Sequence, residues 1–154
     1  MHGMSATSSS PSDLREYEVH GRTTDTFGRV LCGCRTLHFV ADGPVQNDCP
    51  GEAITPAELF LSGVAACAIE LLQVIARERG VPLQTARVTI RGTIDRARPV
   101  RPDLALFNSV RLKFILTGVS REQGTEIVGA FQARCPLYGT VKAATPDVQV
   151  EIEV

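Results

Sequence analysis

The stretch that decides the fold is Thr-Pro-Ala-Glu-Leu-Phe-Leu-Ser-Gly-Val-Ala-Ala-Cys, from Thr55 to Cys67, which continues without a break to Gly80. Thr55 is a preferred N-cap residue, Pro56 suits the first helical position, and Glu58 completes a capping box. Gly80 suits the left-handed conformation that ends many helices, and a proline follows two residues later. The pattern therefore predicts one helix of roughly 24 residues.

This predicted helix is apolar or small at almost every position from residue 59 to residue 76. Its polar exceptions are Ser62, Glu70 and Gln73. A helix that is apolar nearly all round belongs in a protein interior or in a membrane. Glu70 and Gln73 in mid-run, together with the small residues, favour the interior. Cys67 then lies in a closely packed place, where most cysteines are simply small core residues.

Length and composition indicate one soluble domain with a sizeable core. The chain has 154 residues, a formal net charge of -1 and 44% hydrophobic residues. No basic run points to nucleic acid or to a membrane surface as a partner. Residues 1–12 are small and polar, which predicts a disordered leader before a single domain at residues 13–154. Since this leader lacks the apolar core of a signal peptide, we expect a cytoplasmic protein with reduced cysteines.

The rest of the chain predicts an α+β fold in the order β-β-(β)-α-β-β-α-α-β. Alternating apolar residues predict strands at 14–22, 29–41, 86–96, 107–116 and 147–154, the second of them bent or interrupted at Gly33. The strands at 86–96 and 107–116 suggest an antiparallel hairpin. Ser120 and Gln123 form a second capping box, which opens a helix ending near Arg134. Pro136 is well placed to start a further short helical turn through Val141.

Thiol chemistry is the chemistry that the sequence offers, because nucleotide-binding, serine-hydrolase and zinc-protease motifs are absent. Cys67 lies in the central helix. Cys135 precedes Pro136 at a predicted helix N-terminus, where backbone N–H groups stabilise a thiolate. If the two sulfurs meet, one can be oxidised and the other can resolve it as a disulfide. Spacing alone leaves plain core packing of both residues open.

The remaining cysteines do not predict a metal site. Cys32 and Cys34 are separated by one residue in a predicted strand, so both side chains point to the same face of the sheet. No second pair of cysteines follows. Packing on that sheet face is the simpler interpretation. Cys49, in a predicted loop at residues 43–54, has the character of an incidental thiol. We therefore expect neither a metal nor a cofactor.

Two motifs together resemble those of the OsmC/Ohr family. The first is Pro-x-Glu-Leu-x-x-x-Gly-x-x-x-Cys, from Pro56 to Cys67, and the second is the later Cys135-Pro136. The Ala-Asp-Gly-Pro turn at residues 41–44 and the Arg-Gly-Val-Pro-Leu exit at residues 79–83 extend the similarity to nearly the whole domain. The resemblance implies two curved antiparallel sheets wrapped around long central helices in an intertwined homodimer.

The resemblance also implies a reaction. In characterised members one cysteine attacks an organic hydroperoxide and becomes a sulfenic acid, and the Cys-Pro cysteine then condenses with it. A dithiol such as a lipoylated protein restores both thiols. On this pattern Cys67 is the nucleophile and Cys135 the resolving thiol of a peroxidase in oxidative-stress defence. The alternative is a non-catalytic dimer that binds an apolar small molecule at the subunit interface.

The activating groups depart from the family pattern. In the family's peroxidases an arginine stabilises the thiolate and is held by a glutamate directly after the helix-opening proline. Here Ala57 occupies that place and Glu58 follows one residue later, about 100° further round the helix. Arg22 and Arg29 flank the turn where the family's arginine lies, and Arg29 is the better match. The expected site is therefore Cys67, Cys135, Arg29 and Glu58, with a solvated surface role as the alternative for the arginine.

Overall fold

The computed structural model describes residues 14–154, so the predicted leader at residues 1–12 lies outside the described residues. The described residues divide into two compact units, residues 14–55 and residues 56–154. The expectation of one domain spanning residues 13–154 stays a prediction.

The first unit is a three-stranded antiparallel sheet of order β1-β2-β3. Its strands are β1 (His20–Thr23), β2 (Arg29–Cys34) and β3 (Leu37–Asp42), and a 3-10 helix, η1 (Val45–Asn47), follows. The strand predicted at 14–22 is wrong in extent, because β1 begins at His20. The stretch predicted as one strand at 29–41 is two strands. The interruption falls at Arg35, whose φ of 54° makes a tight turn, rather than at Gly33.

The second unit contains one long helix, a second sheet and two shorter helices. Its elements in chain order are α1 (Pro56–Arg79), β4 (Thr85–Thr93), β5 (Ser109–Thr117), α2 (Arg121–Arg134), α3 (Pro136–Ala144) and β6 (Asp147–Glu153). The α+β class and the element order agree with the sequence prediction.

Helix α1 begins and ends where the sequence predicts. Pro56 is its first residue, and Arg77 and Arg79 lie in its last turn, where cations suit the helix dipole. Gly80 has a φ of 65°, which a residue with a side chain rarely adopts. The N–H of Val81 then bonds to the carbonyl of Ala76 at 2.9 Å, which closes the helix end.

The second sheet has the order β4-β5-β6 and is mixed rather than antiparallel. β4 and β5 pair antiparallel, as the predicted hairpin requires, whereas β6 pairs parallel to β5. The prediction of purely antiparallel sheets is therefore wrong here. The physical reason is the connection: α2 and α3 carry the chain back to the starting end of β5 before β6 begins.

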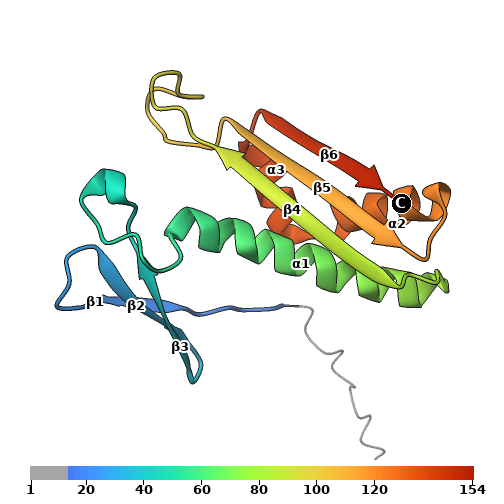
Figure 1. Cartoon of the computed structure of the whole chain (residues 1–154), viewed down its shortest axis with the longest axis horizontal. Helices are drawn as coiled ribbons and strands as arrows, with labels where there is room; N and C mark the ends of the chain where they lie inside the picture. Colours follow the sequence, from blue (N-terminus) through green and yellow to red (C-terminus); the bar gives the residue numbers. More distant parts are fainter. Residues whose placement is uncertain (1–13) are drawn as a thin grey trace, which may run out of the picture. The chain divides into compact units, whose positions relative to one another are not determined.

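The core lies between this sheet and the three helices, which cover one of its faces (Figure 1). β5 contributes four fully buried side chains at alternate positions, namely Val110, Leu112, Phe114 and Leu116. Against them pack Leu72 and Ile75 of α1 and Phe131 of α2. Each such side chain stabilises the fold by about 1.5–3 kcal/mol through burial.

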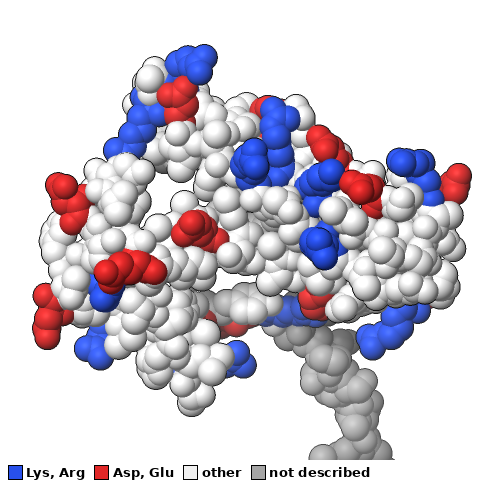
Figure 2. Space-filling model, viewed as in Figure 1, with Lys and Arg blue, Asp and Glu red and all other residues white. Residues whose placement is uncertain are grey.

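The opposite face of this sheet is open and charged. Figure 2 shows cationic and anionic side chains interleaved over it. Two ion pairs cross between β5 and β6, Arg111 with Asp147 at 3.3 Å and Lys113 with Glu153 at 3.0 Å. Because these side chains are about half exposed, each pair contributes little to stability.

Helix α1 buries only one stripe of its surface within the chain. Its buried residues are Val64, Ala68, Leu72, Ile75 and Ala76. By length and composition alone it is long and apolar enough to cross a membrane, although core helices of soluble proteins pass the same test. Of its most apolar 18-residue segment, 28% is buried. The expectation that the protein interior surrounds this helix on all sides is therefore not met within the single chain.

Candidate functional site

The two cysteines singled out in the sequence lie together in the second unit. The Sγ atoms of Cys67 and Cys135 are 2.8 Å apart, although 68 residues separate them in the chain. Both are free thiols. Cys67 comes from the middle of α1, and Cys135 is the single residue between α2 and α3. This separation is short enough for a disulfide to form with a small movement of either side chain.

Cys135 lies at the N-terminus of α3. Pro136 starts α3, and Cys135 is the N-cap residue, with extended backbone angles. Its Sγ accepts a hydrogen bond from the backbone N–H of Tyr138 at 3.3 Å. A sulfur at this position faces the positive end of the helix dipole. Cys135 is only 3% exposed, so it is poorly accessible to a solute.

Cys67 is the more accessible sulfur, but its surroundings oppose ionisation. Burial raises the pKa of Cys67 to about 12, and the hydrogen bond to Cys135 and the charges of Cys135 and Glu70 act in the same direction. The side chain nevertheless remains partly exposed. Within this unit Cys67 is therefore a reachable thiol that needs a cation before it can act as a nucleophile.

Charged pairs join the C-terminal end of α1 to α2. Arg134, the last residue of α2, bonds to both carboxylate oxygens of Glu78 on α1, at 2.6 and 3.3 Å. Arg79 of α1 bonds to Glu126 of α2 at 2.6 Å. The sequence did not predict these ion pairs, because the spacing of the residues does not indicate which helices pack together.

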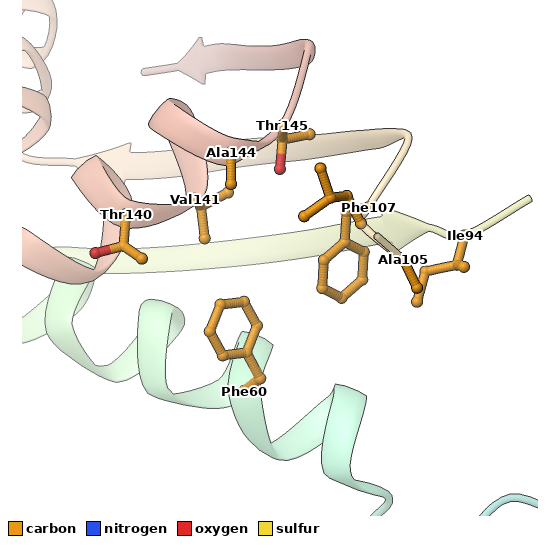
Figure 3. A pocket seen from close by; sticks show the side chains of 9 residues that line it. Phe60, Ile94, Ala105, Phe107, Thr140, Val141, Ala144 and Thr145 are labelled. Atoms are coloured by element: carbon orange, nitrogen blue, oxygen red, sulfur yellow. The ribbon is translucent and has the colours of Figure 1, made fainter. Parts of the chain in front are cut away.

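An apolar pocket of about 260 Å³ lies further along the same helices. Its lining residues are Phe60, Ile94, Ala105, Leu106, Phe107, Thr140, Val141, Ala144 and Thr145. Figure 3 shows the Phe60 ring rising from α1 towards Val141 of α3, with Phe107 beside it. The rings of Phe60 and Phe107 stack at 5.9 Å. The absence of a side chain at Gly92 makes room for Phe107, since a Cβ there would lie 2.7 Å from the ring.

The pocket and the sulfurs share their supporting elements. Phe60 precedes Cys67 by seven residues, so the two side chains leave the same side of α1 about 10 Å apart. On α3, Val141 follows Cys135 by six residues, which is about 9 Å along the helix axis. Both helices therefore lead from the sulfur pair to the pocket, in opposite chain directions.

Arg29 belongs to the first unit and is held there by two carboxylates. Its Nε and Nη2 donate to the carboxylate of Asp42, both at 2.8 Å, and Nη2 also donates to Glu52 at 2.7 Å. Asp42 also accepts the backbone N–H groups of Glu52 and Ala53. Arg29 holds the pKa of Asp42 well below its usual range, and these carboxylates raise the pKa of Arg29. Arg29 thus joins β2 and β3 to the loop before α1, and its proposed action on Cys67 stays a prediction.

Glu58 lies away from the sulfurs. It precedes Cys67 by nine residues, which places it on the opposite side of α1 and about 13 Å along the axis. It lines a shallow pocket of about 200 Å³ with Leu61, Ser62, Ala65 and Ile90. A catalytic role for Glu58 gains no support from this position and stays a prediction.

Comparison with known proteins assigns the family. The sequence matches the model of the OsmC family, described as OsmC-like protein, over residues 49–151. The chain belongs to the OsmC-like family. No curated protein matches it.

Solved OsmC-like structures share its fold. An OsmC-like protein from Mycoplasma pneumoniae is 15% identical, with a TM-score of 0.76 over 91% of this chain and 99% of the other. An organic hydroperoxide resistance protein OsmC from Legionella pneumophila is 21% identical, with a TM-score of 0.73 over 93% and 100%. A Vibrio cholerae protein described as an organic hydroperoxide resistance protein, with captopril bound in one active site, is 25% identical, with a TM-score of 0.70 over 91% and 95%.

The other cysteines of this OsmC-like chain lie in the first unit. Cys32 and Cys34 occupy one face of the sheet, paired across the strands with Phe39 and Leu37. The Cys49 sulfur packs against Gly28 and Gly43, where a Cβ would collide with it. Within residues 14–154, no three His, Cys, Asp or Glu side chains cluster as a metal ion would require.

Proposed function

We propose that this OsmC-like protein reduces organic hydroperoxides, with Cys67 as the nucleophile and Cys135 as the resolving thiol. The observation that carries the proposal is the 2.8 Å separation of their sulfurs. Membership of a family with organic hydroperoxide resistance proteins among its solved structures supports the substrate class.

The first step oxidises Cys67. Its thiolate attacks the outer oxygen of the hydroperoxide, the O–O bond breaks, and the alkoxide leaves and takes a proton to become an alcohol. A new S–O bond makes Cys67 a sulfenic acid, so the sulfur loses two electrons and the peroxide gains them. Cys67 acts first because it is partly exposed, whereas Cys135 is buried.

The second step closes a disulfide. The Cys135 sulfur attacks the Cys67 sulfur, the S–O bond breaks, and the oxygen leaves as water. The sulfurs approach from 2.8 Å to the S–S bond length of about 2.05 Å. A dithiol reductant, such as a lipoylated protein, then restores both thiols by exchange and is itself oxidised to a disulfide.

Ionisation of Cys67 requires a positive charge, because every described influence on its pKa raises that pKa. We assign this role to Arg29, whose carboxylate partners are Asp42 and Glu52 rather than the family's glutamate. The organic part of the substrate occupies the apolar pocket lined by Phe60 and Phe107.

The active protein is, in this proposal, a cytoplasmic homodimer. The apolar side chains that α1 leaves exposed, with Phe60 at 43%, supply the surface that a second copy covers. Five free cysteines suit a reducing compartment.

A second candidate function is binding of an apolar small molecule without turnover. The pocket together with the high pKa of Cys67 favours it. It predicts a bound apolar molecule and thiols that do not react with peroxide.

Rapid-mixing kinetics with cumene hydroperoxide separate the two functions. The peroxidase proposal predicts fast consumption of one equivalent of peroxide by the wild type, none by Cys67→Ser, and a single turnover without a Cys67–Cys135 disulfide by Cys135→Ser. Equal slow rates for all three proteins would reject the peroxidase and leave the binding protein.

A further inference from the structure

Cys135 lies at the junction of two helices. It is the single non-helical residue between α2 and α3, with φ of −82° and ψ of 113°. Its backbone is tied to its own helices, through bonds from its N–H to Phe131 and from Gly139 to its carbonyl, both 2.9 Å. These bonds fix the turn, and Cys135 packs in the core cluster that also contains Ala68 and Leu72 of α1, the helix that carries the other sulfur.

The neighbouring residue supplies a direct connection to α1. Arg134 immediately precedes Cys135, and its two terminal nitrogens bond to the two carboxylate oxygens of Glu78. Glu78 and Cys67 are on the same helix, eleven residues apart. The ion pair and the sulfur contact therefore close a ring through α1 and the α2–α3 junction.

We propose that Arg134 is a positioning residue that, through Glu78, holds Cys135 against Cys67. This inference rests on the proposed function for its kinetic consequence. The two-point contact of a guanidinium with a carboxylate restrains direction as well as distance. This Arg134–Glu78 clamp therefore raises the fraction of time in which the two sulfurs are within reach of each other. It thereby accelerates the condensation of the sulfenic acid with Cys135.

A slower condensation leaves the sulfenic acid exposed to a competing reaction. A second hydroperoxide can oxidise the Cys67 sulfenic acid to a sulfinic acid, releasing a second alcohol, and Cys135 cannot reverse that step. The clamp thus determines how often a turnover ends in inactivation. It does not touch the first attack on peroxide, which takes place at the accessible side of Cys67.

The size of the effect follows from the exposure of the pair. The side chains of Arg134 and Glu78 are 42% and 48% exposed. An exposed ion pair changes an equilibrium by about two- to fivefold. The same change in the population of the reactive arrangement alters the ratio of sulfinic acid to disulfide by about two- to fivefold.

The test uses Arg134→Gln and Glu78→Gln, with Arg79→Gln as the matched control. Arg79 makes a comparable bond between α1 and α2, at 2.6 Å to Glu126, but lies at no cysteine. Cumene hydroperoxide is added in rising excess, and the first-step rate and the sulfinic fraction of Cys67 are measured by rapid mixing and by mass spectrometry. Both clamp variants should raise the sulfinic fraction about two- to fivefold at an unchanged first-step rate. The control should match the wild type, and the charge exchange Arg134→Glu with Glu78→Arg should restore it.

A second measurement tests the clamp without peroxide. The equilibrium between the dithiol and the Cys67–Cys135 disulfide in a glutathione buffer reports how well the fold presents one thiol to the other. Arg134→Gln should weaken disulfide formation about two- to fivefold, and Arg79→Gln should not. Clamp variants identical to the wild type in this equilibrium would overturn the inference. A wild type that forms the disulfide in glutathione but ignores peroxide would reject the proposed function instead.

Discussion

Removing the charge of Glu70 tests the electrostatics of Cys67. Glu70 lies three residues after Cys67 on α1, so the two side chains are neighbours on one face of the helix. At roughly 6 Å in an environment close to water, two unit charges interact by about 0.7 kcal/mol. Because one pKa unit is about 1.4 kcal/mol, Glu70→Gln should lower the pKa of Cys67 by about half a unit.

The assay is the rate of alkylation of Cys67 by iodoacetamide as a function of pH, read by peptide mass. Below the pKa, the variant should react about threefold faster than the wild type. The difference should shrink in high salt, since the carboxylate is exposed. Glu151→Gln, on the outer face of β6, removes the same charge elsewhere and should have no effect. An unchanged or higher pKa in Glu70→Gln, or an equal shift in the control, would refute the reasoning.

Three further predictions concern the core, the first unit and the pocket. Phe131→Ala should lower the free energy of unfolding by about 3–5 kcal/mol in denaturant titration, because this buried ring packs on two others; a loss below about 1 kcal/mol would contradict the packing. Folding lowers the pKa of Asp42, so its ion pair with Arg29 stabilises the folded protein at pH values above the ordinary pKa of an aspartate. This stabilisation is lost as the pH falls below that ordinary value. Acid melts of the wild type should show this loss and those of Asp42→Asn should not; identical pH profiles would refute it. Phe60→Ala should slow turnover of long-chain hydroperoxides about tenfold relative to tert-butyl hydroperoxide, and equal slowing of both would exclude the pocket as the substrate site.

Local signals in the sequence predicted the helices well. Pro56 and Gly80 delimit α1, and the capping box at Ser120 is present in the structure, with Gln123 as its second partner. The short helix after Pro136 was predicted to Val141 and runs to Ala144. These features depend on neighbouring residues, which a sequence displays directly.

Features that depend on residues far apart in the sequence were harder to predict. The alternation at residues 147–154 predicts a strand but is the same for parallel and antiparallel pairing, so the direction of β6 could not be inferred. Residues 14–19 show the alternating side-chain pattern that is typical of a strand, yet β1 begins only at His20. Within residues 29–41 the turn is made by Arg35, a residue with no turn preference to reveal it.

The candidate site shows the same division. Residue types and the family resemblance singled out Cys67 and Cys135, but only the fold brings sulfurs 68 positions apart to 2.8 Å. The partners of Arg29 were missed because Asp42 and Glu52 approach it across a strand pair and a loop. Glu58 shares a motif with Cys67, but the helical repeat turns it to the opposite side of α1.

Trapping the oxidised form of Cys67 tests the central claim most directly. In Cys135→Ser the sulfenic acid has no resolving partner, so one equivalent of cumene hydroperoxide followed by dimedone should label Cys67 in nearly every chain. The wild type treated in the same way should instead contain the Cys67–Cys135 disulfide. Absence of label on Cys67 in the variant, together with reduced thiols in the wild type, would contradict the account.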